Sequence, residues 1–597
     1  MATPTTMLTE ISGQKLTTEQ TAYLDGLFAG LRNRGLSFGD VEPNPAASPP
    51  TTPVADLIPE ERIKRELHPL DAYPLLLQHA AANQSPDREN TFRFKWQGLF
   101  YLTPNREAYM ARLRIPGGRL HSFQLRELAD IADKLTTGYL QITTRANLQM
   151  RLIEPKDTVE FVRRIQGIGL HTRGSGADNI RNLTCDPTSG VDPDELIETL
   201  PLVEALGQLI LNHREFYDLP RKFNIAFHGG GAIPTVEDTN DIGFKAVQVA
   251  PEAPGDGATR SHGTLVTDRV AGGAYFRCAL GGATGHKAFA QDLGVLIRPE
   301  EVLEVTAALL RVYIANGNRG DRKKARLKHL LEHWSLDRYR TETERLLGRS
   351  LLRIPDEARW VPGTAPAQPH PQVGVRAQRQ PGFFWMGARV PVGQVTSRQL
   401  RRLAEIADLY GSGEVRLTVW QNVVLPNVPE AFVETARKAL ARIGFETRQS
   451  HVGTGVIACT GSSYCKFASA DTKGHALELM RWLERRVELD QPINIHLTGC
   501  PNSCAQHYMG DLGLLGTKLK VGGESIPGYH LFVGGGFGDR QAVGRQLFTG
   551  VSASQLNPTI ERILKNFLRH RLPGEMFQSF TMRHDLRRLQ EILGDES

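Results

Sequence analysis

An internal repeat constrains this chain of 597 residues more than any other feature. The segment LRIPGGRLHSFQLRELADIA, which starts at Leu113, returns as ARVPVGQVTSRQLRRLAEIA at Ala388, a shift of 275 residues. The same shift holds without a gap as far as Ile168 and Ile443. A repeat at one fixed shift indicates that the chain folds as two related halves.

Each copy has the pattern of a strand, a turn, a helix, a second strand and a second helix. In the first helix of each copy, apolar residues recur at positions i, i+3, i+4 and i+7, as on one face of an amphipathic helix. They are Leu128, Ile131, Ala132 and Leu135 in the first copy and Leu403, Ile406, Ala407 and Tyr410 in the second. These faces are expected to pack into a core.

A shorter repeat follows at a shift of 270 residues, where Lys222-Phe223-Asn224-Ile225 corresponds to Pro492-Ile493-Asn494-Ile495. We therefore expect an α+β fold built as a fused pseudo-dimer, with a ligand where the two pseudo-symmetric halves meet. Proline-rich stretches at 42–57 and 362–381 are interpreted as linkers. The expected divisions are an N-terminal helical arm with its linker (1–88), a first half (89–172 and 173–355), a linker (356–381) and a second half (382–448 and 449–597).

Six cysteines are too few for a disulfide framework in a chain of this length, and four of them lie between Cys459 and Cys504. This clustering indicates metal or redox chemistry, whereas Cys185 and Cys278 are expected to be buried free thiols. No apolar run approaches the roughly 18 residues of a membrane helix, and the N-terminus lacks a secretory pattern, so we expect a cytoplasmic protein without a membrane partner. The net charge of +6 favours acidic partners and anionic ligands, but no base-reading motif indicates nucleic acid.

The spacing of the four clustered cysteines favours an iron–sulfur cluster over zinc. Five residues separate Cys459 from Cys465, and after a further 34 residues come Cys500 and Cys504, which are separated by three residues. In structural zinc sites the two cysteines of a pair are usually closer in sequence and lie in small domains. Both pairs here lie in glycine-rich loops of a long chain. Glycines allow backbone amides to approach a cluster and donate to its sulfurs.

With TGCPNSC closing it, this cysteine pattern resembles the site of the assimilatory nitrite and sulfite reductases, a ferredoxin-dependent family that carries siroheme and a [4Fe–4S] cluster. The resemblance covers about residues 90–597, including the duplication. It implies that Cys459, Cys465, Cys500 and Cys504 hold the cluster. It further implies that Cys504 bridges the cluster to the siroheme iron.

The first half carries basic residues where the second half has none. Arg112 corresponds to Gly387, Arg145 to Trp420, and Lys222 to Pro492. Such a division would let one half hold the cluster while the other surrounds an anionic substrate and the siroheme carboxylates with cations.

The resemblance assigns individual positions to these roles. The motifs RLRIPGG, DNIRN and LPRKFN imply a substrate pocket formed by Arg112, Arg181, Lys222 and Asn224. The implied siroheme contacts are Lys95, Gln141, Thr143, Thr144, Arg145, Gln149, Arg221 and Asn502.

The function implied is reduction of nitrite to ammonium at siroheme, with Lys222 as the expected proton donor. Asn224, where sulfite reductases of the family carry a lysine, and the 34-residue gap between cysteine pairs favour nitrite over sulfite. No convincing nucleotide fingerprint is present, so the expected electron donor is an external small acidic protein, which the resemblance implies is ferredoxin. The alternatives are a ferredoxin-dependent sulfite reductase and, in a different class, a zinc-stabilised binding protein that has lost catalysis.

Overall fold

The computed structural model describes residues 10–11, 14–15, 57–101, 107–253, 262–363 and 370–595. The chain divides into two compact units, Met1–Asp56 and Leu57–Ser597. In the first unit, β1 (Glu10–Ile11) pairs antiparallel with β2 (Gln14–Lys15). Residues 16–56, which include almost all of the linker expected at 42–57, lie outside the described residues.

The second unit begins well before residue 89, where the sequence placed the boundary. Helices α2 (Pro59–Glu66), α3 (Tyr73–Ala81) and α4 (Arg88–Arg93) belong to this unit. Ile63 packs in a small core with Trp96, and Leu76 is fully buried in the central core of the unit. Residues 57–88 are therefore not part of a separate arm, because their apolar side chains complete the core of the first half.

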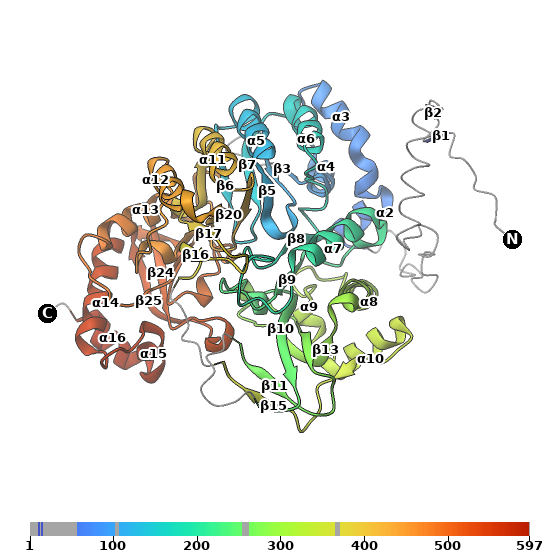
Figure 1. Cartoon of the computed structure of the whole chain (residues 1–597). Helices are drawn as coiled ribbons and strands as arrows, with labels where there is room; N and C mark the ends of the chain where they lie inside the picture. The colour runs from blue at the N-terminus through green and yellow to red at the C-terminus, as the bar shows by residue number, and fades with distance from the viewer. Residues whose placement is uncertain are drawn as a thin grey trace. The chain divides into compact units, whose positions relative to one another are not determined.

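The duplicated α+β fold is confirmed (Figure 1), although each copy has two strands before each helix where the sequence predicts one. In both copies the expected apolar stripe is buried or partly buried in one continuous core. A Thr396–Gln399 capping box begins the first helix of the second copy. The first copy consists of β4 (Tyr109–Arg112), β5 (Arg119–His121), α5 (Ser122–Leu135), β6 (Tyr139–Ile142), β7 (Leu148–Ile153) and α6 (Thr158–Gly167). The second consists of β17 (Phe383–Ala388), β18 (Gln394–Thr396), α11 (Ser397–Tyr410), β19 (Glu414–Leu417), β20 (Val423–Pro429) and α12 (Val433–Arg442).

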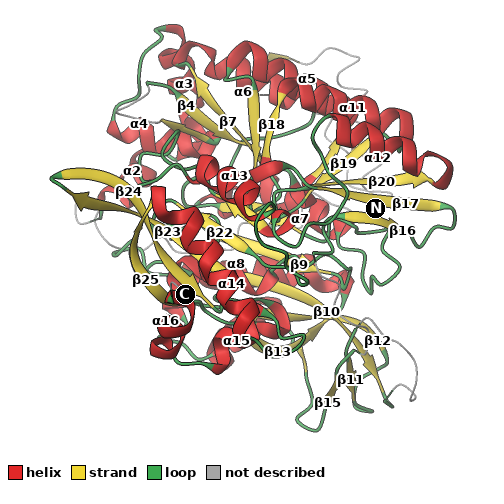
Figure 2. Cartoon of the chain, turned by 90° about the vertical axis from the view of Figure 1, so that its left-hand side faces the viewer, coloured by secondary structure: helices red, strands yellow, loops and turns green. Residues whose placement is uncertain are grey.

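The two copies exchange a strand. The first strand order is β18-β6-β7-β4-β3, with β3 at Leu99–Tyr101, and the second is β16-β17-β20-β19-β5, so β5 and β18 each pair in the sheet of the other copy. Helices α5 and α11 lie side by side over these strands (Figure 2). Arg126 pairs with Asp408, and its counterpart Arg401 pairs with Asp133 at 2.6 Å. These matched ion pairs mark the pseudo-twofold relation between the copies.

Each half also contains a larger sheet that begins with three parallel strands. In the first half these are β8 (Ile180–Thr184), β9 (Phe223–His228) and β10 (Ile242–Ala250). On one side of β10 the sheet continues with β12 (Gly273–Leu280), β13 (Gln291–Ile297) and β14 (Leu352–Arg353), and on the other with β11 (Thr264–Val266) and β15 (Arg359–Val361). In the second half they are β21 (Val456–Ala458), β22 (Ile495–Thr498) and β23 (Leu512–Val521), followed by β24 (Glu524–Val533) and β25 (Arg545–Ser552).

Helices pack with each of these sheets to form its core. The first sheet has α7 (Leu200–Asn212), α8 (Val302–Asn316), α9 (Leu327–Leu330) and α10 (Leu336–Leu347). The second has α13 (Thr472–Leu483), α14 (Leu556–His570), α15 (Phe577–Arg583) and α16 (Leu586–Gly594). None of the helices in the described residues combines the length and apolar character needed to cross a membrane.

The linker predicted at 356–381 is wrong in its described parts. Residues 359–361 form β15, and residues 374–377 form β16, which pairs antiparallel with β17. Val373 is fully buried and Gln372 nearly so. The second half therefore begins before residue 382, because this segment adds an edge strand to its sheet.

Candidate functional site

The four clustered cysteines lie in two loops at one edge of the second half's larger sheet. Cys459 directly follows β21, and Cys500 follows β22 by two residues. Since β21 and β22 are parallel neighbours, the loops after them emerge at the same edge. The backbone N–H of Gly499 donates to Sγ of Cys459 at 3.2 Å, which ties the two loops together.

The thiols of these loops influence one another electrostatically. Burial raises the pKa of Cys504 to about 11, and Cys459 and Cys500 shift it in the same direction. Burial also raises the pKa of Cys500, with Cys465 and Cys459 adding to the shift. Among the described residues, no three His, Cys, Asp or Glu side chains are close enough to share one metal ion, which is the arrangement a single zinc ion would require.

Cations from the first half surround Cys504. Arg112 ends β4, Arg145 lies in the turn between β6 and β7, and Lys222 immediately precedes β9. Lys222 and Arg112 lower the pKa of Cys504, while the Cys504 thiolate in turn opposes the lowering of the pKa of Arg145 by burial. The cysteines of one half and the cations of the other therefore form a single site.

Arg112 and Arg181 are held by backbone carbonyls, and Arg145 is held by the side-chain oxygen of Asn240. Arg181 donates to the carbonyls of Ser175 and Ala177, both at 2.8 Å, and Arg112 donates to the same Ser175 carbonyl at 3.3 Å. In the described part of the chain, no carboxylate forms an ion pair with Arg112, Arg145, Arg181 or Lys222. These four cations are half-buried and lack counter-charges, so this geometry suits an anionic ligand.

Burial and neighbouring arginines change the acidity of Lys222. Its pKa falls to about 7, first through burial and then through Arg326 and Arg181, while the Cys504 thiolate opposes the shift. Lys222 is thus the one lysine of the predicted pocket, and its pKa lies close to neutral pH.

Gln141 and Gln149 are connected to the cysteine loop by an arginine that the sequence analysis missed. Arg151 donates to Gln149 Oε1 at 2.6 Å, to Gln141 Oε1 at 3.2 Å and to Thr460 Oγ1 at 2.7 Å. Thr460 also donates to Gln141 at 3.0 Å. The sequence pattern could have identified Arg151. Side chains two residues apart in a strand lie on the same face, and Arg151 follows Gln149 at that spacing in β7.

The remaining predicted siroheme contacts differ in how close they lie to this site. Thr144 donates to the Cys504 carbonyl at 2.8 Å, and Asn502 lies exposed between Cys500 and Cys504. Thr143 shapes its own turn by accepting from the Arg145 backbone at 3.1 Å, as Thr418 does from Trp420 at 3.2 Å, so this contact belongs to the shared fold.

Lys95 and Arg221 lie with Arg322 around a buried carboxylate. Burial lowers the pKa of Lys95, and Lys466, which follows Cys465, adds to the shift. Asp178 is fully buried, lies 3.6 Å from Arg221 and accepts two hydrogen bonds from Arg322, both at 2.8 Å. The two predicted contacts are therefore on the rim of the cationic site, and Arg221 already has an ionic partner.

Asn224 makes hydrogen bonds that its counterpart in the second half, Asn494, also makes. Its backbone N–H and its side-chain amide donate to Asp241 Oδ2 at 2.8 and 3.3 Å, and Asn494 donates to Asp511 in the same way at 2.8 and 3.2 Å. Asp241 also accepts two hydrogen bonds from the buried Arg326, at 3.0 and 2.7 Å. Asn224 is therefore fixed by the fold next to Lys222. Arg326 was missed because it stands in a basic run that reads as solvated surface.

The pseudo-symmetric counterpart of the site is filled. Continuing the shift of 270 residues places Pro234 where Cys504 stands, and the Trp420 indole, in place of Arg145, donates to the Pro234 carbonyl at 2.8 Å. A side chain at Gly387, in place of Arg112, would lie 2.4 Å from the Gln372 carbonyl. The duplicated fold thus keeps one site open and closes the other with Trp420 and the segment before β16.

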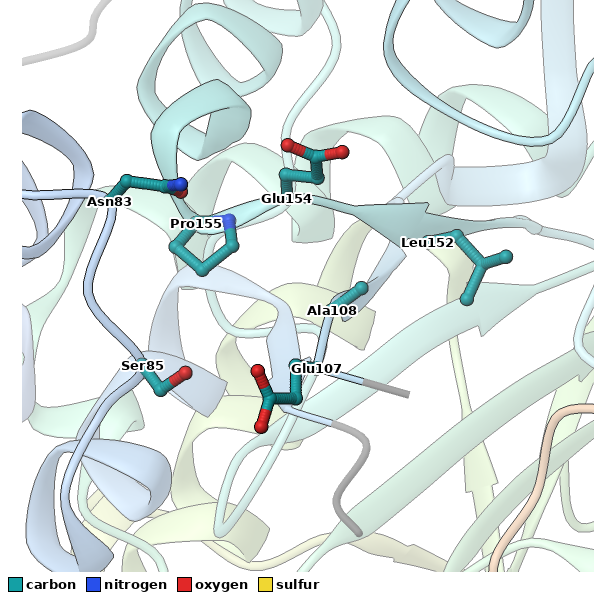
Figure 3. Close-up of a pocket in the computed structure, with 7 residues that line it drawn as sticks. All are labelled: Asn83, Ser85, Glu107, Ala108, Leu152, Glu154 and Pro155. Atoms are coloured by element: carbon teal, nitrogen blue, oxygen red, sulfur yellow. The ribbon is translucent and has the colours of Figure 1, made fainter. Parts of the chain in front are cut away.

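A separate cavity of about 520 Å³ contains none of the predicted site residues (Figure 3). It is lined by Asn83, Ser85, Glu107, Ala108, Leu152, Glu154 and Pro155. Its charged groups are two carboxylates, one of which, on Glu154, pairs with Lys156. An acidic lining does not suit the anionic ligands for which the cationic site is built.

Comparison with known families matches both parts of the repeat. Residues 103–168 and 376–443 match the nitrite/sulfite reductase ferredoxin-like half domain. Residues 176–351 and 453–596 match the nitrite and sulphite reductase 4Fe-4S domain.

Individual relatives match over most of the chain. A ferredoxin–nitrite reductase from Synechococcus elongatus is 36% identical over 80% of this chain and 89% of its own length. An assimilatory ferredoxin-dependent nitrite reductase from Haloferax mediterranei is 30% identical over 83% and 85%. The Mycobacterium tuberculosis NirA structure superposes with a TM-score of 0.80 at 28% identity, covering 89% of this chain and 97% of that one. The chain therefore belongs to the nitrite and sulfite reductase family, whose members carry siroheme and a [4Fe–4S] cluster.

Proposed function

We propose that this chain reduces nitrite to ammonia with electrons from ferredoxin, at the site that both halves form around Cys504. The observation that carries the proposal is the meeting of four cysteines with Arg112, Arg145 and Lys222, which lack carboxylate partners in the described part of the chain. Ferredoxin–nitrite reductases among the relatives support the choice of substrate and donor.

The residues present fit both cofactors of the family. Cys459, Cys465, Cys500 and Cys504 would hold the cluster as thiolates, and Gly499 is required beside them because an added Cβ would lie 2.6 Å from that of Ala468. The carboxylates of siroheme would supply counter-charges for half-buried arginines of the site such as Arg145. When bound, siroheme supplies the iron at which nitrite is reduced, and the cluster supplies the electrons.

Arg112 and Arg181 would hold the substrate anion. Both donate to the carbonyl of Ser175, which fixes the two guanidinium groups before any ligand arrives. Preorganised cations stabilise negative charge that develops as N–O bonds break, without reorganisation during the reaction.

Lys222 would deliver protons, and Asn224 would complete the pocket beside it. A general acid works best when its pKa is close to the working pH, and the pKa of Lys222 is lowered to about 7. The arginines cannot take this role because they stay protonated.

The test of the proposed function is a comparison of two anions with the purified holoenzyme and reduced ferredoxin. We expect kcat/KM for ammonium formation from nitrite to exceed that for sulfide formation from sulfite by at least about tenfold, or ~1.4 kcal/mol. A preference for sulfite would assign the chain to sulfite reduction, and turnover of neither anion by fully loaded enzyme would contradict the proposal.

Salt should separate docking of ferredoxin from the chemical step. The chain carries a net charge of +6, and an acidic donor would approach it with electrostatic help. Raising the ionic strength from about 0.1 to 1 M shortens the screening length from about 10 to 3 Å. We expect ferredoxin-driven turnover to fall several-fold more than turnover driven by a small reducing dye. Equal losses would argue against electrostatic docking.

Asn224 and Asn494 form a matched pair that separates a role in the pocket from a role in the fold. Changing either residue to alanine removes the side-chain hydrogen bond to its aspartate and should lower the free energy of unfolding by about 1 kcal/mol. Only Asn224→Ala should also lower kcat/KM for nitrite, because only Asn224 lies next to Lys222. Thermal unfolding and nitrite kinetics of both variants test this, and equal kinetics would remove Asn224 from the pocket.

We further propose that the protein works in the cytoplasm. All six cysteines lie in the described residues as free thiols, including the buried Cys185 and Cys278 that the sequence analysis predicted. Free thiols persist in reducing compartments.

A further inference from the structure

Lys473 is a buried lysine on the first turn of α13, on the protein side of the cysteine loops. Its side chain is 6% exposed. The ammonium donates to the carbonyls of Val392 and, at 3.4 Å, of Ala458. Among the described residues, no carboxylate forms an ion pair with it, and the nearby Asp471 caps α13 by accepting from the Gly474 N–H at 3.3 Å.

The contacts of Lys473 place it against one particular cysteine. Ala458, whose carbonyl it reaches, directly precedes Cys459. The neighbouring Thr472 donates to the Cys459 carbonyl at 2.7 Å, and its hydroxyl lies 3.5 Å from Sγ of Cys459. Lys473 is therefore a buried cation held beside Cys459.

A buried cation without a counter-charge is destabilising unless an anion lies close to it. A cluster held by four thiolates is such an anion, and reduction adds one further negative charge to it. The cation is attracted more strongly to the reduced cluster than to the oxidised one, and low local polarity strengthens that difference.

We propose that Lys473 sets the reduction potential of the cluster by making reduction more favourable. The inference rests on the proposed function, because it requires a cluster at Cys459. Lys473 is a tuning and positioning residue in this account, since it acts through the cluster and does not reach the substrate pocket.

A structural role makes a different prediction. Lys473 also joins the Val392 carbonyl of the second ferredoxin-like copy to the Ala458 carbonyl of β21. Lys473→Gln keeps a hydrogen-bond donor at this position and removes the charge. Lys473→Met removes both and leaves an apolar side chain that a buried site accepts.

Lys466 provides the matched control. It follows Cys465 directly, but its side chain is exposed, so solvent screens its charge. Lys466→Gln therefore removes the same charge next to another cysteine of the cluster with little effect on the potential.

The experiment is a redox titration of the purified holoenzymes, with the reduced cluster followed by electron paramagnetic resonance. We expect Lys473→Gln and Lys473→Met to favour the oxidised cluster at least tenfold, which equals a midpoint potential about 59 mV more negative for one electron. Lys466→Gln should shift the ratio less than threefold.

Four outcomes decide the matter. A cluster-bearing Lys473→Gln with an unchanged or more positive potential overturns the inference, as does a shift of equal size in Lys466→Gln. If both Lys473 variants fold but hold no cluster, Lys473 is a structural requirement and the inference also fails. Absence of a cluster from the unmodified protein would instead contradict the proposed function.

Discussion

Cys459→Ser is expected to remove the cluster absorption and to lower nitrite turnover by more than about 100-fold, since even loss of a residue that only supports a metal ligand costs about 10–100-fold. Serine offers an alcohol in place of a thiolate, and the loop would then lack one ligand of the cluster. Iron content, visible absorption and turnover of the purified variant measure the effect.

The duplication offers an internal control for this substitution. Cys185 follows β8 as Cys459 follows β21, but it is 3% exposed and its closest polar contact is the Asp186 carbonyl at 3.7 Å. Burial raises the pKa of Cys185 far above its usual range. Cys185→Ser should therefore keep the full iron content and cost only about 1–3 kcal/mol of stability. Wild-type iron in Cys459→Ser, or iron loss in Cys185→Ser, would contradict the assignment of the ligands.

Substitution of Lys222 should have the second large effect on nitrite turnover. Two substitutions separate the role of its positive charge from its role as proton donor. Lys222→Met removes both and should lower kcat/KM for nitrite by about 10²–10⁴-fold. Lys222→Arg keeps the charge but cannot give up a proton, so KM should stay within about threefold while kcat falls by about 10²-fold or more.

Siroheme content of both Lys222 variants is the control for this experiment. Arg145 and the other residues assigned to siroheme remain in each variant, so the visible spectrum should be retained. A colourless Lys222→Met would make Lys222 a residue that holds the cofactor. Full turnover in Lys222→Arg would rule out proton delivery by this side chain.

The duplication and its helices could be predicted because they depend on local periodicity. The apolar positions of α5 and α11 repeat at a fixed shift, and burial of one face follows from that pattern. The exchange of β5 and β18 could not, because each strand has three residues and its partner is chosen by the neighbouring copy. Local sequence does not specify which of two similar sheets a short edge strand joins.

Composition predicts the extent of the N-terminal arm and of the second linker wrongly. Residues 57–88 follow a proline-rich stretch, yet Ile63 and Leu76 are buried. Residues 370–377 lie in another such stretch, yet Val373 is fully buried and β16 extends a sheet. Proline and polar residues indicate a connection, but a few apolar side chains among them are enough to dock the segment.

Charged residues were the hardest to interpret from sequence. Arg112, Arg181 and Lys222 stand out because each lies in a recognisable motif, whereas Arg326 lies in an ordinary basic run and Lys473 lies outside any such motif. Charged side chains are exposed in most proteins, so their burial becomes visible only when the elements around them are packed. For Asn224 the motif indicates a role in the pocket, but the structure shows that it also has a role in the fold. Its side chain donates a hydrogen bond to an aspartate, as Asn494 does in the second half.

The most direct test of the central claim is the visible spectrum and iron content of the purified chain, followed by titration with nitrite. The account predicts a siroheme spectrum, about five iron atoms per chain from one [4Fe–4S] cluster and one siroheme, and a spectral shift that saturates at lower concentrations of nitrite than of sulfite. A colourless protein that takes up neither iron nor siroheme on reconstitution would contradict it.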